Sequence, residues 1–249
     1  MTLVLLAVEL IALYILSGAL TQGLFDVFVL LFRSRTIGVT AISVITFPGT
    51  VIHELSHLFT AEVLGVHTGK LTLVPEGLDD PSANSGQGEI KAGSVMIAAT
   101  DPFRRYIIGL APIFTGLIFI TALSYLLINP TVIPITLPEL SIFNYQFSII
   151  SLLILYLLLA ISNSMFSSKE DLKGFIPFLI ALAAMIAAAY FAGLRIGLTG
   201  ALLDFVIKIL DALTKSLGVV LALNIAGFIL IKLLTIVAQK LTRRKLVHR

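Results

Sequence analysis

The chain has 249 residues, of which 58% are hydrophobic and 12% charged, and its formal net charge is +3. Soluble globular domains carry about 25% charged residues, so this composition excludes an ordinary soluble domain and indicates a membrane protein. The absence of cysteine excludes disulfides and thiolate metal ligands, and the small net charge gives no indication of nucleic-acid binding.

Apolar runs long enough to cross a bilayer recur along the chain, since about 20 residues suffice for one crossing. They cover 3–32, 37–66, 107–128, 142–162, 175–193 and 217–238. The first run is over-long, with a candidate break at Thr21-Gln22-Gly23, and it contains Glu9 but no basic region. We therefore interpret it as a retained helix rather than a cleaved signal. The sequence predicts an all-α polytopic membrane protein with about six transmembrane helices.

A polar insertion at 67–106 follows the second predicted helix. Within it, the β-compatible runs 71–74 and 94–98 flank a centre rich in Gly, Asp, Ser and Pro, which predicts a small β-hairpin-like insertion. Asp101 followed by Pro102 is typical of a helix N-cap, and it predicts the start of the third helix. A second polar insertion covers 162–174.

Charged residues also recur at helical spacing just before the last apolar run. Asp204, Lys208, Asp211 and Lys215 predict an amphipathic helix over 198–217, lying flat on the membrane surface. Because no internal repeat or low-complexity linker interrupts the chain, we expect one domain over 1–249.

Basic residues predict the orientation in the membrane. They cluster in the loop 66–106, in the loop 163–174 and in the tail after the last apolar run, whereas 129–141 contains no Lys or Arg. This distribution favours both termini in the cytoplasm, although Arg33 and Arg35 then fall outside. With no targeting signal in the sequence, we expect a plasma membrane.

The stretch VIHELSHLF, residues 51–59, places two histidines and a glutamate inside an apolar run. His53 and His57 are four residues apart, so in a helix they share one face and two imidazole nitrogens can bind one Zn²⁺. Glu54 lies about 100° around the helix, where it can act as a general base toward a water molecule. Ionisable residues inside a membrane are costly and usually functional, so the pattern favours a zinc site.

A catalytic zinc normally has three protein ligands, so one more is needed. His67 and His248 are interpreted as surface histidines, which leaves carboxylates as candidates: Glu62, Glu76, Asp79, Asp80, Glu89, Asp101, Glu170 and Asp171. The fourth span ends near Asn163, on the same side of the membrane as the histidines. If the segment after Asn163 dips into the membrane, it can bring a carboxylate back to the metal. This argument favours Asp171 or Glu170.

The segment FPGTVIHELSHLFTAEVLGV resembles the zinc-binding helix of the site-2 protease family, which are intramembrane zinc metalloproteases. That family has a second motif, N-x-x-P-x-x-x-L-D-G, and here Asn163 and Asp171 have the same separation. The resemblance implies Asp171 as third zinc ligand and Asn163 as a partner of the oxyanion or the attacking water. The segment GLAPIFTGL, 109–117, is similar to a small-residue and Pro segment between the two family motifs.

The second motif departs from the family pattern at three positions. Phe166 replaces Pro, Glu170 replaces Leu and Leu172 replaces Gly, so Glu170 stays a rival for the role of third ligand. The resemblance covers roughly 37–190 and implies a divergent member.

These observations predict an intramembrane metalloprotease with one zinc ion per chain, which hydrolyses peptide bonds in or near transmembrane segments. The expected partners are a transmembrane protein or peptide substrate and the lipid bilayer; no oligomeric state is assigned. An edge strand in 67–106 is expected to pair with the unwound substrate. The alternatives are a metal-binding transporter or sensor, a pseudoprotease, and a membrane zinc peptidase with Glu76 as third ligand.

Overall fold

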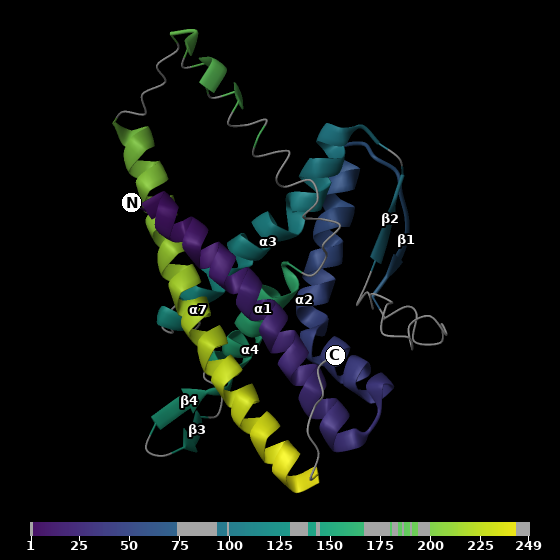
Figure 1. Ribbon diagram of the computed structural model, residues 1–249. Helices are drawn as coiled ribbons and strands as arrows, with labels where there is room; N and C mark the ends of the chain where they lie inside the picture. Colours follow the sequence, from purple (N-terminus) through teal and green to yellow (C-terminus); the bar gives the residue numbers. More distant parts are fainter. Residues whose placement is uncertain are drawn as a thin grey trace.

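The computed structural model describes residues 2–73, 94–98, 100–129, 139–142, 145–166, 180, 184–185, 187–189, 191–193 and 200–242. Four helices are long and apolar enough to cross a membrane, namely α1 (Thr2–Phe32), α2 (Arg35–Val63), α3 (Pro102–Ile128) and α7 (Ala201–Thr242). A shorter apolar helix, α4 (Ile149–Ser164), packs among them (Figure 1). The protein is therefore a multi-pass membrane protein of the all-α class.

The first three predicted spans are confirmed as α1, α2 and α3. The expected break at Thr21-Gln22-Gly23 is absent, because α1 is one continuous helix through these residues. The predicted fourth span, 142–162, is instead the shorter apolar helix α4 of 16 residues, which starts at Ile149 and ends at Ser164. The reason is that the sequence YQFS alternates aromatic and polar residues, which is a strand pattern, and it forms a strand. The predicted fifth span, 175–193, lies mostly outside the described residues.

The prediction of a separate amphipathic helix at 198–217 is wrong. These charged residues belong to α7, which continues through the last apolar run as one helix of 42 residues. At 1.5 Å per residue α7 is about 63 Å long, roughly twice the hydrocarbon thickness. Lys215 Nζ lies 2.7 Å from Asp211 Oδ2, and this exposed i,i+4 ion pair belongs to the same helix. No proline interrupts the junction, and the helix simply continues.

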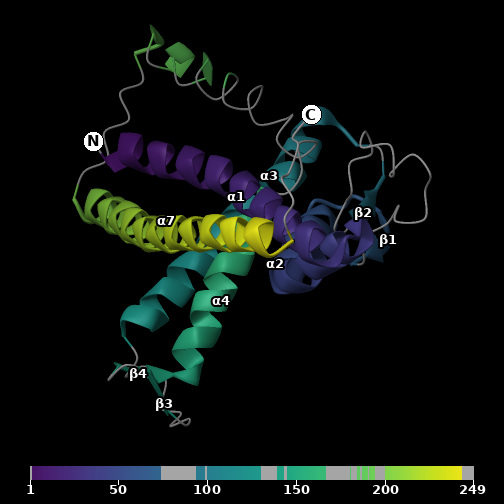
Figure 2. The ribbon, with the colours of Figure 1, turned by 60° about the horizontal axis from the view of Figure 1, so that its bottom comes forward.

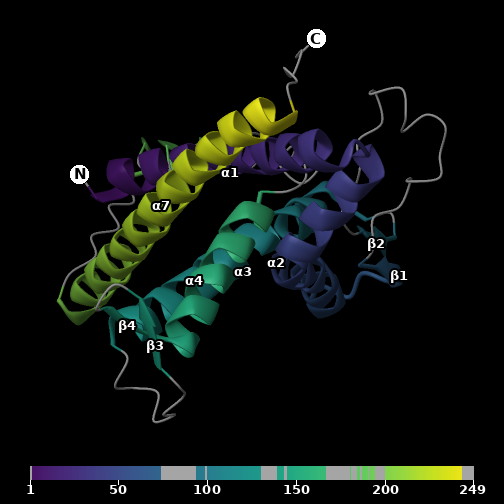
Figure 3. The same cartoon turned by 90° about the horizontal axis from the view of Figure 1, so that it is seen from below.

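Helices α1 and α7 run parallel to each other, side by side (Figures 1 and 3). Early in α1, Glu9 Oε1 lies 3.6 Å from where a Cβ on Gly218 would be, and further along, Gly23 approaches Ile231. The start of α1 and the end of α7 therefore lie at opposite ends of the bundle. This arrangement differs from the predicted placement of both termini on one side, because two parallel helices that cross a membrane begin on the same side.

Two small antiparallel sheets lie outside the helices. β1 (Thr68–Thr72) pairs with β2 (Ser94–Ile97), which confirms the predicted hairpin-like insertion after the second helix. β3 (Glu139–Ile142) pairs with β4 (Tyr145–Ser148) between α3 and α4. In Figure 1 the two sheets lie on opposite sides of the bundle, with β1–β2 beside α2 and β3–β4 at the lower left, where α3 ends.

The core lies where α4 meets α1, α3 and α7 (Figure 2). Its side chains include Leu158 of α4, Ile120 of α3, Leu13 of α1 and Leu217 of α7, which are at most 1% exposed. Because apolar side chains cover both sides of α4, this short helix has a fixed position between the longer ones. Its last turn is consequently held next to α2, which carries the histidines.

Candidate metal centre

The HELSH residues lie in the second half of α2, and all of their ionisable side chains are buried. His53 is 4% exposed, while Glu54 and His57 are each 6% exposed. Polar groups removed from water in this way need partners or a bound ion, because desolvation without compensation is costly. His53, Glu54 and His57 thus lie on one helix, as predicted, and all three are buried.

The end of α2, about two turns after His57, is fixed by a Schellman motif. Gly65, with φ of 68°, lies just beyond the C-cap, and its N–H donates to Glu62 O at 3.0 Å. The N–H of Val66 donates to Ala61 O at 2.8 Å, and these two bonds are those of the motif. Because Gly65 adopts a positive φ without strain, the helix ends there and β1 can start.

His53 and His57 face each other with their Nε2 atoms 3.2 Å apart. Their ring planes are 82° apart and the ring centroids are 4.8 Å apart. Two imidazole ligands at about 2.0–2.1 Å from a tetrahedral zinc would have their nitrogens about 3.3 Å apart. The spacing between the two Nε2 atoms therefore fits the requirement for a shared metal ion.

The other ring nitrogen of His57 is bound to α3. His57 Nδ1 lies 2.8 Å from the carbonyl oxygen of Ile108. A carbonyl only accepts hydrogen bonds, so Nδ1 must carry the proton, and in neutral His57 the lone pair is then on Nε2. This arrangement is the usual one for a metal-binding histidine, whose second N–H donates to a backbone carbonyl or carboxylate.

The carbonyl of Ile108 can accept this bond because of the residue four positions later. In a regular helix it would accept from the N–H of residue 112, but residue 112 is Pro112, which has no N–H. Pro112 is buried inside α3, in the GLAPIFTGL segment that the sequence analysis singled out. Sequence reasoning did not assign a role to Ile108 or Pro112, although a proline within an apolar helix was a visible signal.

Helix α4 lies alongside α2, and the two run parallel in register. Tyr156 Oη donates to Ile45 O at 3.0 Å, and one turn later Gly49 lies against the backbone of Ala160. Another turn along both helices, the same register places the end of α4 level with His53. The chain therefore leaves α4 next to the histidine pair.

The carboxylates Glu170 and Asp171 lie outside the described residues, as do Glu76, Asp79, Asp80, Glu89 and His248. Residue 171 is five residues beyond Phe166, where the described part of the chain stops, so it lies within about 18 Å of that point. Among the described residues, no cluster of three His, Cys, Asp or Glu side chains is present.

Asn163 lies in the last turn of α4 and faces α7. Its Nδ2 donates to Leu159 O at 2.7 Å and to Asn224 Oδ1 at 2.9 Å. Asn224 is 1% exposed and donates in turn to Ser162 Oγ at 3.0 Å. Both N–H groups of the Asn163 amide are thus used, whereas its Oδ1 is buried with no hydrogen-bond partner among the described residues. Asn224 was missed from the sequence, although it is an isolated amide in an apolar run.

The remaining described candidates lie away from the histidine pair. His67 is exposed, as expected for a surface histidine, and Glu62 accepts a hydrogen bond from Thr68 Oγ1 at 3.1 Å. Asp101 caps α3 as predicted, since its Oδ1 accepts from the N–H of Arg104 at 3.0 Å. This hydrogen bond holds the pKa of Asp101 below its usual value.

No protein-family model, curated protein or solved structure matches this chain.

Proposed function

We propose that the protein is an intramembrane zinc metalloprotease that hydrolyses peptide bonds in or near transmembrane segments of membrane protein substrates. The observation that carries the proposal is the pair of buried Nε2 atoms of His53 and His57, 3.2 Å apart on a membrane-spanning helix; Glu54, the residue that follows His53, is buried as well. The hydrogen bond from His57 to the Ile108 carbonyl adds support, because it fixes the metal-binding tautomer.

The proposed third ligand is Asp171, with Glu170 as the rival. This assignment rests on the separation between Asn163 and Asp171, which resembles the second site-2 protease motif. The place where α4 ends supports it, because the chain leaves that helix level with His53 and has only a few residues to cover before 171. One zinc ion per chain would then have two imidazoles and one carboxylate, with a fourth position left for water.

The bound zinc would lower the pKa of a water molecule and polarise the scissile carbonyl. Glu54 takes the proton from the attacking water and delivers it to the leaving amine. Asn163 contributes as an acceptor: both of its N–H groups bind within the bundle, and the Oδ1 atom is available to orient the water. An oxyanion would require a donor, so the water is the better partner for Asn163.

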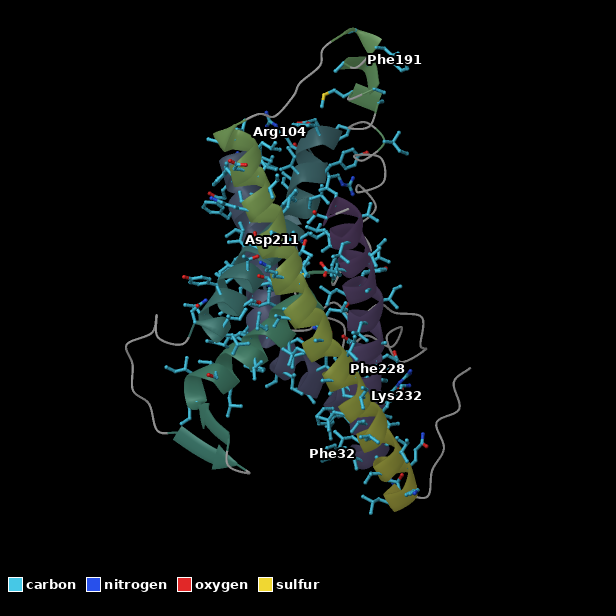
Figure 4. All side chains as sticks on the ribbon, turned by 90° about the vertical axis from the view of Figure 1, so that its left-hand side faces the viewer. Phe32, Arg104, Phe191, Asp211, Phe228 and Lys232 are labelled. Atoms are coloured by element: carbon cyan, nitrogen blue, oxygen red, sulfur yellow. The ribbon has the colours of Figure 1, made fainter. Side chains whose placement is uncertain are left out.

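The proposed substrate is a transmembrane protein or peptide whose helix is locally unwound. An unwound segment loses its internal hydrogen bonds, and an edge of the β1–β2 sheet, which pairs with no third strand in the described part of the chain, would replace them. We also propose that the protein lies in a plasma membrane, with basic residues at both ends of the bundle: Lys70, Arg104 and Arg105 near the β1–β2 sheet, and Arg33, Arg35 and Lys240 at the other end. Arg104 lies near one end of the bundle and Phe32 near the other (Figure 4).

The test is zinc content and cleavage of a transmembrane substrate library by purified protein in lipid nanodiscs. The wild type is expected to retain one zinc and cleave. Glu54→Gln should retain zinc and lose essentially all turnover, and Asp171→Ala should lose zinc, whereas Glu170→Gln should keep both properties.

Each alternative predicts a different outcome. A transporter or sensor retains its ion-dependent behaviour in Glu54→Gln, because ion binding needs no general base. A pseudoprotease binds membrane partners without any cleavage in the wild type. Loss of zinc in Glu170→Gln but not in Asp171→Ala would make Glu170 the third zinc ligand in place of Asp171. Loss of zinc in Glu76→Gln would instead make Glu76, in the polar insertion, the third ligand.

A further inference from the structure

Pro112 stands in a place where a helix does not favour proline. It lies inside α3, ten residues after the helix begins, and its side chain is buried. Proline is the poorest helix former, since it removes one backbone hydrogen bond and its ring crowds the preceding turn. The start of a helix would tolerate it, but this position is in the interior, so its presence calls for a physical reason.

The carbonyl that Pro112 leaves without its helical partner is the one that His57 uses. Ile108 O accepts from His57 Nδ1 at 2.8 Å, and Ile108 is itself 2% exposed. Ile108 packs against Ala61 and Val66 at the end of α2, so its backbone is fixed relative to the histidine helix. A carbonyl in a complete helix already accepts one N–H with one of its two lone pairs, whereas residue 112 offers no N–H to Ile108 O, so the bond from His57 does not compete with a helical one.

We propose that Pro112 is a positioning residue for the metal centre. By withholding an N–H from Ile108 O, it keeps that carbonyl as the acceptor for His57 Nδ1–H. The proton then stays on Nδ1, the ring is held by α3, and the Nε2 lone pair points to the side where His53 Nε2 lies. This inference rests on the proposed zinc site, but the tautomer of His57 can be measured in the metal-free protein.

The decisive variants differ only in one N–H. Pro112→Ala restores a backbone donor that competes for Ile108 O. A matched control replaces Pro112 with the α-hydroxy analogue of alanine, which has the same methyl group but an ester oxygen instead of the N–H. Pro48→Ala is a second control, since Pro48 is the other proline inside a membrane helix next to the site. In the described part of the chain, the Val44 carbonyl that Pro48 leaves free accepts no side-chain hydrogen bond.

Two readouts are needed, both on full-length protein in nanodiscs. The first is the zinc Kd from competition with a chelator, which should rise about 10- to 100-fold in Pro112→Ala and stay within about threefold of wild type in both controls. The second is the ¹⁵N spectrum of the histidine rings in metal-free protein at about pH 8. There His57 should be the Nδ1–H tautomer in wild type and the hydroxy analogue, and a mixture of tautomers in Pro112→Ala.

A purely structural role for Pro112 predicts something else. In that case the alanine and hydroxy-acid variants would weaken zinc binding equally, because both lack the ring, and this result would overturn the inference. An unchanged His57 tautomer in Pro112→Ala would overturn it as well. Wild-type protein that binds no zinc would remove the proposed function, while the tautomer comparison would still decide the role of Pro112.

Discussion

Gly49 of α2 lies directly against the backbone of Ala160 in α4. A Cβ at position 49 would be 2.7 Å from the Ala160 carbonyl carbon and would also overlap the Ala160 carbonyl oxygen and Ser164 Oγ. Since the overlap is mostly with backbone, no side-chain rotation can relieve it. The absence of a side chain at Gly49 thus sets the distance between the histidine helix and the helix that leads to Asp171.

Replacing Gly49 with alanine should separate the two helices one turn away from His53. We expect Gly49→Ala to destabilise the protein by about 2–3 kcal/mol, as overpacking does, and to lower its zinc content. Gly18→Ala is the control, because Gly18 is also inside a membrane helix but a Cβ there meets nothing within 4 Å. Thermal unfolding and metal analysis measure both effects. Equal behaviour of the two variants would show that α2 and α4 do not pack this closely.

The amides of Asn163 and Asn224 connect α4 to α7. Asn224→Leu should remove the acceptor of the Asn163 amide and the donor to Ser162 Oγ. The loss of these two hydrogen bonds inside a membrane should lower the free energy of unfolding by about 1–2 kcal/mol. We expect zinc content to stay normal and the cleavage rate to fall about tenfold, or 1.4 kcal/mol, because the Asn163 amide loses its fixed orientation.

Thr235→Val is the matched control on the same helix. Its hydroxyl donates to Ile231 O of its own helix at 2.8 Å, so the change removes a hydrogen bond that holds no other helix. It should leave the cleavage rate unchanged. A similar loss of rate in both variants would attribute the effect to α7 in general rather than to the Asn163–Asn224 contact.

The parallel arrangement of α1 and α7 predicts which segments share a membrane side. The natural chain has no cysteine, so single-cysteine variants give clean labelling with an impermeant maleimide. Thr36→Cys and Thr242→Cys should react from one side of the membrane, and Thr2→Cys and His67→Cys from the other. Labelling of Thr2→Cys and Thr242→Cys from the same side would restore the topology expected from the basic residues, and it would contradict the parallel packing.

The sequence was most informative where one periodicity dominates. The helical pairing of His53 with His57, the cap at Asp101 and the hairpin after α2 all follow from local spacing, and the structure contains them. The orientation of α7 relative to α1 is different in kind. The packing of α7 against α1 depends on small residues that let the two helices approach closely, such as Gly23 against Ile231. A local sequence pattern does not predict which helix such a residue will contact.

Local sequence patterns also do not predict the hydrogen-bond partners around the histidine pair. The bond between His57 and Ile108 joins residues 51 positions apart, and the reason for it lies in a third residue, Pro112. The bond between Asn163 and Asn224 spans 61 positions. Single-sequence reasoning identifies residues by chemical type, and these contacts are decided by tertiary packing. The roles of Asp171 and Glu170 stay predictions, since both lie outside the described residues.

Glu9 is a buried carboxyl on α1, 7% exposed, and its Oε2 has no hydrogen-bond partner among the described residues. A polar atom buried in this way costs about 1–3 kcal/mol. Glu9→Met keeps the volume and removes the polar group, so we expect it to raise the stability measured by thermal unfolding, whereas Glu9→Gln should not. Loss of cleavage in a stabilised Glu9→Met variant would instead give the carboxyl a functional role.

The outer edge of β2 provides a direct test of substrate pairing. Ala98 N–H donates to His67 O at 3.0 Å, and the register shift of this sheet places its extra residue on β1, between Thr68 and Leu71. Alternation along β2 is therefore kept, and it puts the N–H of Val95 on the edge away from β1. Val95→Pro removes this donor while sparing the β1–β2 hydrogen bonds, and prolines are tolerated on edge strands. We expect cleavage of a transmembrane substrate to fall at least tenfold, with KM raised and zinc content normal.

Val95→Thr keeps the N–H and should cleave as the wild type does. Wild-type cleavage by the proline variant would exclude pairing at this edge and direct attention to β1.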